Sequence, residues 1–354
     1  MKKYIVIITG GVVLALFLSV IFAVSRLNIR GQENELEFVS FAPGTIGQLY
    51  NDEWRVRPAK ISGRLHLPLG EGPFPAVVLM HGNFDPKDLA PWYDDLVPRL
   101  IESNIAAFVV DSFTGRGITS TAENPARLSR AARLVDAFRA LSTLVPEDKI
   151  DERRIGISGY ASGGTAALLA AHREVIGARI AGGRSFMAHL PVYPSCQSRF
   201  RSQALSYRPM LLLTGGRDEY EPAEYCLDYA EKSSSAGYDV RINTYPEAKH
   251  AWINRYKMTY CEECVTLKEC GPMYIEDSGH ETALGGRVST KFGWGEYIEK
   301  VYRECGQREL NLNINEAARA DTLAKTVEFF KENLKEDLID PEQENREWKH
   351  YLQN

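Results

Sequence analysis

The sequence lacks any excess of basic charge, any internal repeat and, before residue 196, any cysteine. Its 354 residues carry 42 Lys and Arg against 47 Asp and Glu, a formal net charge of −5. This balance gives no electrostatic reason to expect nucleic acid as a partner. Long uncharged apolar runs are also missing after residue 24. What remains has the composition of an ordinary globular protein, long enough for one large α/β domain with additions.

The one long uncharged run, Tyr4–Val24, lies directly after Lys2 and Lys3. It has roughly the length needed to span a bilayer. It is longer than a typical signal-peptide core, and its cleavage pattern, at residues 23–25, is weak. We therefore interpret residues 1–30 as a single-pass membrane anchor, with a cleaved signal as the alternative. The two lysines favour a cytoplasmic N-terminus, which would place the rest of the chain in the periplasm or on the extracellular side.

The second half of the chain holds an even number of cysteines, which suits an oxidising compartment. They are Cys196, Cys226, Cys261, Cys264, Cys270 and Cys305. The closely spaced Cys261, Cys264 and Cys270 could also bind zinc together with His280. The spacing of Cys270 and His280, however, matches no common zinc finger. We therefore expect disulfides and no metal.

Strand-like and helical patterns alternate along the middle of the chain. Strand patterns occupy residues 36–41, 61–67, 76–80, 105–110, 154–158, 210–214 and 240–244, and helical patterns occupy 92–103, 127–144 and 317–334. This alternation predicts a mostly parallel sheet with helices on both faces. We expect residues 31–334 to form one α/β domain and residues 335–354 to form a charged tail.

The most informative stretch is Gly159-Tyr160-Ala161-Ser162-Gly163, which follows the strand pattern at 154–158. A buried strand, a glycine-flanked turn and a helix are the layout of a nucleophile elbow, in which the glycines let strand and helix pass close together. In that frame the tip is Ala161, which has no nucleophile. Ser162 is the alternative nucleophile, but its frame puts Tyr160 where the turn has least room. With Ala161 at the tip, the backbone N–H of Ser162 is expected to be an oxyanion donor.

Two further polar residues follow strand patterns downstream. Asp218 comes just after the strand at 210–214, and His250 lies on the loop after the strand at 240–244. Open α/β sheets place their sites at such strand ends, and the order nucleophile, acid, histidine is that of α/β hydrolases. His250 would take a proton from the nucleophile and return it to the leaving group. Asp218 would hold the imidazole in the correct tautomer.

Two residues nearer the N-terminus are candidates for substrate contacts. His81-Gly82-Asn83 follows a buried strand, so the backbone N–H of Asn83 is a candidate second oxyanion donor. Arg116 lies after the next strand and could bind a substrate carboxylate. The alternative for Arg116, which we favour, is a structural ion pair with an acidic residue.

Several of these stretches together resemble the dienelactone hydrolase family of α/β hydrolases. The resemblance covers roughly residues 55–255 and resumes in the last helix. It rests on the segments at 73–82, 110–117, 154–164, 215–218, 222–226 and 245–252. It implies an α/β-hydrolase fold and a serine or cysteine nucleophile that acts on small ester or lactone substrates through an acyl-enzyme, without a metal or organic cofactor. It also implies that Cys196 pairs with Cys226, which leaves the pairing of the other four cysteines open.

The chain departs from the family pattern at two places. The nucleophile position holds Ala161, and residues 255–310 form a cysteine-bearing insertion between the histidine and the final helix. Two hypotheses follow. In the first, the chain is a membrane-anchored ester or lactone hydrolase. It is either active through another nucleophile, such as Ser162, or has lost its nucleophile only in this version of the sequence. Alternatively, it is a non-catalytic relative that binds a ligand or partner in the former active site. The sequence leaves its oligomeric state open.

Overall fold

The computed structural model describes residues 32–202, 204–254 and 260–335. The membrane anchor expected at residues 1–30 lies outside these residues, as does nearly all of the expected tail. Within the described ranges, no helix is long and apolar enough to cross a membrane.

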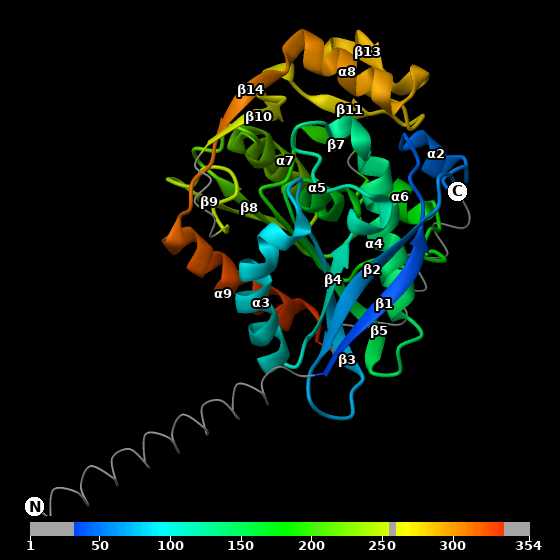
Figure 1. The fold of residues 1–354 in the computed structure, drawn as a ribbon, viewed down its shortest axis with the longest axis vertical. Coiled ribbons are helices and arrows are strands. Elements are labelled where there is room, and N and C mark those ends of the chain that lie inside the picture. The colour runs from blue at the N-terminus through cyan, green and yellow to red at the C-terminus, as the bar shows by residue number, and fades with distance from the viewer. Residues whose placement is uncertain (1–31, 203, 255–259, 336–354) are drawn as a thin grey trace, which may run out of the picture.

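The strands and helices alternate along the hydrolase-like part of the chain (Figure 1). The strands are β1 (Gln32–Ser40), β2 (Ala59–Leu67), β3 (Phe74–Met80), β4 (Ala106–Asp111), β5 (Ile150–Tyr160), β6 (His189–Val192), β7 (Ser198–Phe200), β8 (Met210–Gly215), β9 (Val240–Tyr245), β10 (Tyr260–Thr266), β11 (Met273–Ile275), β12 (Glu281–Ala283), β13 (Val288–Ser289) and β14 (Gln307–Asn311). The α-helices are α2 (Gly47–Tyr50), α3 (Ala90–Glu102), α4 (Arg130–Leu144), α5 (Ser162–Leu169), α6 (Arg173–Gly177), α7 (Ala223–Ser235), α8 (Trp294–Cys305) and α9 (Glu316–Asn333).

The main sheet has eight strands in the order β1-β2-β4-β3-β5-β6-β8-β9. Strands β1 and β2 pair antiparallel with each other, and β2 pairs antiparallel with β4. From β4 to β9 every neighbouring pair is parallel. The sheet is therefore mixed at one edge and parallel across its centre. The carboxyl ends of β3, β5, β8 and β9 consequently meet along one side of the sheet.

Strand β3 shows why the sheet is covered by helices on both faces. Its residues are almost all apolar, and successive side chains of a strand point to opposite faces. Val78 packs into a core with α4, α5 and α6, where Phe138 is a large buried contact. Val77 packs into a second core with α3 and α9, where Trp92 and Phe330 are buried. An uninterrupted apolar strand thus serves two cores.

The insertion expected at residues 255–310 forms its own small elements above the carboxyl edge of the main sheet (Figure 1). Its strand β11 pairs in parallel with β7, a short strand of the hydrolase-like part, in a four-stranded sheet ordered β13-β12-β11-β7. Strand β10 pairs antiparallel with β14. A separate apolar cluster around Met273, Trp294 and Tyr297 packs α8 onto this sheet. The insertion is therefore joined to the main domain by backbone pairing as well as by packing.

All six cysteines form disulfides. Cys196 pairs with Cys226, the partner that the family resemblance implied. The remaining pairs are Cys261–Cys264 and Cys270–Cys305, both within the insertion. Since Cys261, Cys264 and Cys270 are oxidised, they offer no thiolates for the zinc site considered as an alternative. Among the described residues, no group of His, Cys, Asp and Glu is arranged to hold a metal ion.

Candidate active site

The turn between β5 and α5 is sharply strained at Ala161. Its φ of 49° and ψ of −116° lie in a region that non-glycine residues rarely occupy. Strain of this kind persists only where the surrounding structure enforces it, and it clusters at functional sites. Ser162 is already the first residue of α5. The tip of the turn is therefore Ala161, and Ser162 follows it.

The two glycines flanking the tip are required by close backbone approach. A Cβ added to Gly159 would lie 2.2 Å from the carbonyl oxygen of Gly163. A Cβ added to Gly163 would lie 2.3 Å from the carbonyl oxygen of Met80, at the end of β3. Both distances are far inside van der Waals contact with backbone atoms. The glycines thus bring α5 directly against β5 and β3, and this leaves Ala161 projecting at the sheet edge.

His250 and Asp218 form a buried hydrogen-bonded pair. The Nδ1 atom of His250 lies 2.8 Å from Oδ2 of Asp218. The other carboxylate oxygen, Oδ1, accepts the backbone N–H groups of Tyr220 and Glu221, each at 2.8 Å. Asp218 is thus fixed on both sides. This arrangement leaves Nε2 of His250 as the ring nitrogen available to a reacting group.

Two tyrosines that the sequence did not single out hold the His250 ring. The ring centroid of Tyr193 lies 4.8 Å from that of His250, and the ring centroid of Tyr220 lies 4.6 Å from it. Tyr193 also has a positive φ, of 37°. Its position directly after β6 is the one signal that could have identified it, because sites gather at strand ends.

A pocket of about 470 Å³, which we call the elbow pocket, brings the predicted residues together. Ala161, His250 and Asn83 all line it. The loop carrying Asn83 lies close to the tip, since a Cβ on Gly82 would be 3.3 Å from the Ala161 Cβ. Most other lining groups are apolar or aromatic. The pocket therefore has a nucleophile position, a histidine and a candidate oxyanion loop within one small space.

A larger cavity of about 760 Å³, which we call the insertion cavity, lies under the insertion. It shares Asn83 and Tyr220 with the elbow pocket, and its roof includes Trp294 of α8. Ser162 lines this cavity, whereas the elbow pocket is lined by Ala161 and His250. The hydroxyl-bearing residue and the histidine thus belong to the walls of different spaces.

Glu221 gives the insertion cavity an unusual carboxyl group. Burial raises the pKa of Glu221 to about 8, even though a hydrogen bond with Ser195 favours its charged form. The negative charge of Asp218 raises this pKa further, and Arg130 opposes the rise. Near neutral pH this side chain is therefore mostly a carboxylic acid, which can donate as well as accept a hydrogen bond.

The candidate oxyanion loop is held from behind by a buried arginine. The Nη2 group of Arg133 donates to the carbonyl oxygen of His81, and the ring Nε2 of His81 accepts the backbone N–H of Ser112 at 3.1 Å. Burial, followed by the positive charge of Arg133, lowers the pKa of His81 well below its usual value. His81 is therefore neutral and structural, and it fixes the start of the loop that carries Asn83.

Arg116, a candidate for binding a substrate carboxylate, lines neither the elbow pocket nor the insertion cavity. Its Nη2 lies 2.7 Å from Oδ1 of Asp136, and its Nη1 lies 2.9 Å from Oδ2 of the same carboxylate. Asp136 is fully buried. A buried carboxylate needs a charged partner, and Arg116 supplies it. The ion-pair alternative is the one that the structure supports.

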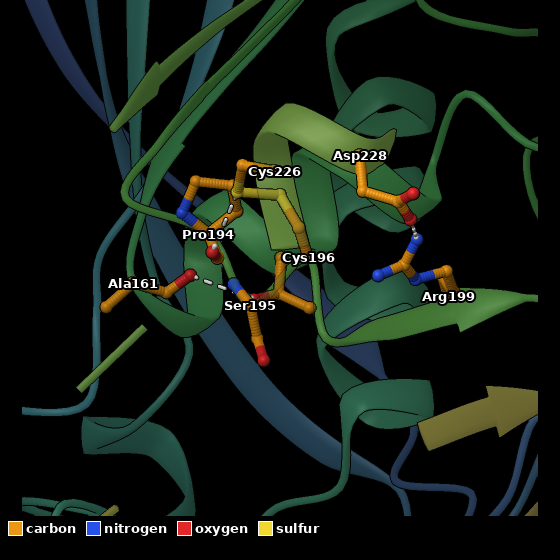
Figure 2. The surroundings of a disulfide bond; sticks show 8 residues. Ala161, Pro194, Ser195, Cys196, Arg199, Cys226 and Asp228 are labelled. Carbon is orange, nitrogen blue, oxygen red and sulfur yellow. Dashed lines mark hydrogen bonds and ion pairs between the residues drawn. A yellow bond between two sulfur atoms is a disulfide. The ribbon is translucent and has the colours of Figure 1, made fainter. Parts of the chain in front are cut away.

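The Cys196–Cys226 disulfide lies close behind the elbow (Figure 2). It joins the loop after β6 to helix α7, and Sγ of Cys226 lies 3.7 Å from the carbonyl oxygen of Pro194. The next residue, Ser195, donates its backbone N–H to Oγ1 of Thr165 in α5 at 2.9 Å. The disulfide thus braces the segment that carries Tyr193 and supports the elbow helix.

Comparisons with known proteins agree with the fold. The family model described as the dienelactone hydrolase family matches residues 61–268. A provisionally named carboxymethylenebutenolidase of Yersinia pestis is 27% identical over 207 residues, which are 54% of this chain and 73% of that protein. A protein of the same provisional name from Methylorubrum extorquens is 26% identical, over 56% of this chain and 69% of its own. The solved structure m3DLH has a TM-score of 0.52 at 16% identity and covers 86% of this chain and 100% of its own, which is a likeness of fold alone.

Proposed function

The chain belongs to the dienelactone hydrolase family, and from that premise we propose that its elbow pocket is an ester- or lactone-hydrolase site whose nucleophile position holds alanine. One observation carries the proposal. Ala161 occupies the strained tip of the elbow, and His250, bonded to Asp218 at 2.8 Å, lines the same pocket. A strained tip that shares a pocket with a hydrogen-bonded histidine is what a nucleophile–histidine–acid triad requires.

The residues present would perform every role except the attack. The backbone N–H groups of Asn83 and Ser162 would bind the oxygen of a polarised ester carbonyl. A nucleophile at position 161 would pass its proton to Nε2 of His250 as it formed the acyl-enzyme, and His250 would then protonate the leaving alcohol. Asp218 would stabilise the imidazolium throughout. With a methyl group at position 161, the chain binds the ester but forms no acyl-enzyme.

The second candidate function is therefore ligand binding without hydrolysis. The observation that favours it is the placement of Ser162, which lines the insertion cavity and not the elbow pocket. A substitute nucleophile must lie within hydrogen-bond reach of His250, and Ser162 is in the wall of a different space. This reading keeps the same pocket and the same class of ligand.

The deciding experiment restores the missing hydroxyl. The full chain and its Ala161→Ser variant are mixed with p-nitrophenyl acetate, and released p-nitrophenol is followed from the first milliseconds. We expect the serine variant to give a burst equal to its active-site concentration and a turnover on the order of 10³-fold or more above the unmodified chain, because triad members act as a unit.

Two matched variants make the outcome specific. Adding His250→Ala to Ala161→Ser should remove the burst, and Ser162→Ala in the unmodified chain should change nothing. If the unmodified chain already turns over and Ser162→Ala abolishes this, the nucleophile is Ser162 and our frame is wrong. If neither chain reacts, although the serine variant folds with an unchanged circular dichroism spectrum, the site is not a hydrolase site and the binding function is favoured.

We further propose that the domain is held at a membrane, outside the cytoplasm, by residues 1–30. The apolar run at residues 4–24 and the three disulfides, which need an oxidising compartment to form and persist, support this placement. Protease added to cells whose outer envelope is permeabilised, but whose cytoplasmic membrane is intact, should digest the domain and spare cytoplasmic marker proteins. Recovery of the whole domain in the soluble cytoplasmic fraction would contradict the proposal.

A further inference from the structure

The Cys261–Cys264 disulfide forms part of the wall of the elbow pocket. Cys264 is fully buried and lines this pocket, as does Leu310 of β14. Cys261, in contrast, keeps part of its surface exposed. One half of the disulfide therefore borders the elbow pocket, and the other half belongs to a residue that is partly exposed.

The disulfide closes an irregularity in the ladder between β10 and β14. Cys261 is paired with Leu310, and Val265 is paired with Arg308. Val265 lies four residues after Cys261 on β10, whereas their partners Arg308 and Leu310 are only two residues apart on β14. Extra residues in one strand disturb a ladder and increase its local twist. The bond between Cys261 and Cys264 spans these extra residues and holds them in one conformation.

The β10–β14 ladder is connected to both loops of the catalytic pair. Leu312, just beyond β14, forms a parallel β-bridge with His250. At the end of β10, Oγ1 of Thr266 donates to the carbonyl oxygen of Tyr220, on the acid loop, at 3.3 Å. A change in the bulge would therefore reach the backbone of His250 and the loop after Asp218 through hydrogen-bonded neighbours.

The other two disulfides do not line the elbow pocket, although Cys305, like Cys261, keeps part of its surface exposed. Cys196 and Cys226 are both 1% exposed, so neither sulfur is open to an attacking thiol. The Cys196–Cys226 and Cys270–Cys305 bonds span 30 and 35 residues, whereas Cys261–Cys264 spans 3. A bond that closes a short loop restricts the unfolded chain least. We therefore expect that opening Cys261–Cys264 costs the protein little stability and that the reduced chain stays folded.

We propose that Cys261–Cys264 is a thiol–disulfide exchange site for a dithiol reductant, and that its opening loosens the wall of the elbow pocket. A thiolate of the reductant attacks Sγ of Cys261, the bond between the two cysteines breaks, and Cys264 leaves as a thiolate that takes a proton. The second thiol of the reductant then attacks the mixed disulfide and releases Cys261 as a thiol. The reductant departs as a disulfide, having given up two electrons and two protons.

The exchange itself is tested on the full chain with dithiothreitol at pH 8 under native conditions. Aliquots are quenched with iodoacetamide, then unfolded, reduced and labelled with N-ethylmaleimide, so that peptide mass spectrometry separates early from late thiols. We expect Cys261 and Cys264 to be alkylated first, at least about tenfold faster than Cys196 and Cys226, since access controls the rate. The proposal is overturned if Cys261 and Cys264 stay oxidised while another pair opens, or if all open only on unfolding.

The effect on the pocket is tested by amide hydrogen exchange. We compare the oxidised chain with the chain reduced selectively at Cys261 and Cys264 and with the Cys261→Ser/Cys264→Ser double variant, using Cys270→Ser/Cys305→Ser as the control. Peptides covering residues 307–312 and 248–254 should exchange about tenfold faster in the selectively reduced chain and in the Cys261→Ser/Cys264→Ser variant than in the oxidised chain. In the control, the peptide covering residues 248–254 should exchange at the rate of the oxidised chain. Unchanged exchange in the selectively reduced protein would show an inert disulfide, even if the double variant failed to fold. Neither measurement uses ester hydrolysis, so failure of the disulfide proposal can be distinguished from failure of the proposed function.

Discussion

Replacing Glu221 with glutamine should make the protein more stable, by an amount that depends on pH. The pKa of Glu221 is raised from its usual 4.5 to about 8, mainly because the carboxyl group is buried beside the insertion cavity. Between these two pH values the folded protein binds one proton that the unfolded chain has lost. The free energy of unfolding therefore falls as pH rises through this window. Each pH unit costs about 1.4 kcal/mol, or about 3 kcal/mol from pH 4.5 to pH 7.

The measurement is urea unfolding of both chains, with disulfides intact, at pH 5, 6, 7 and 8. Glu221→Gln has no carboxyl group to ionise, so its advantage over the unmodified chain should grow by about 1.4 kcal/mol per pH unit and level off above pH 8. Glu224→Gln, at an exposed position in the first turn of α7, is the matched control and should show no such growth. A constant gap between the Glu221→Gln and unmodified chains across this range would refute the reasoning.

Three further predictions concern the scaffold and the proposed chemistry. Arg116→Ala leaves a fully buried carboxylate without its partner, so the free energy of unfolding in urea should fall by about 3–5 kcal/mol; a loss below about 1 kcal/mol would contradict this. Gly159→Ala forces a Cβ to 2.2 Å from a backbone oxygen and should cost more than about 4 kcal/mol or prevent folding, whereas Gly295→Ala, which meets nothing within 4 Å, should be neutral or stabilising. In the Ala161→Ser protein, Asp218→Asn should lower kcat for p-nitrophenyl acetate about 10⁴-fold, and an unchanged kcat would remove Asp218 from the triad.

The elbow, the acid and the histidine could be predicted because each is encoded locally. The glycines around Ala161 report a turn with no room for side chains, and that requirement is visible in five residues of sequence. Asp218 and His250 each follow an apolar strand, so parallel pairing of β8 and β9 was enough to bring them to one edge of the sheet. Strand periodicity and chain order thus placed residues that are 32 positions apart.

The residues that surround the site could not be found in this way. Tyr193 follows β6, a four-residue strand containing Pro191, which has too little pattern to be recognised. Its contact with His250 depends on the neighbouring positions of β6 and β8 in the sheet. Arg116 was similarly ambiguous, because its partner Asp136 lies 20 residues further along the chain, on α4. The sequence alone does not show that the two side chains meet. Long-range side-chain contacts of this kind are set by packing, which a single sequence does not display.

The insertion showed the same limit. Its four cysteines predicted two disulfides but not which pairs would form, since several pairings satisfy the count. The pairing follows from the fold, in which β11 aligns with β7 and α8 packs over the resulting sheet. A three-residue strand such as β7 gains its conformation from this partner, so no local signal marks it in advance.

The antiparallel pairing of β1 and β2 fixes where the start of the described chain lies relative to the pocket. Gln32, at the start of β1, lies opposite Leu67 at the end of β2, beside the amino ends of the parallel strands, whereas the insertion lies beyond their carboxyl ends (Figure 1). The elbow pocket is on this carboxyl side too, because Ala161 and His250, which line it, follow β5 and β9. The seven residues of β3 alone separate these two sides by about 23 Å. The start of the described chain therefore lies on the opposite side of the domain from the pocket. A ligand of the elbow pocket would thus approach the domain from the side opposite Gln32.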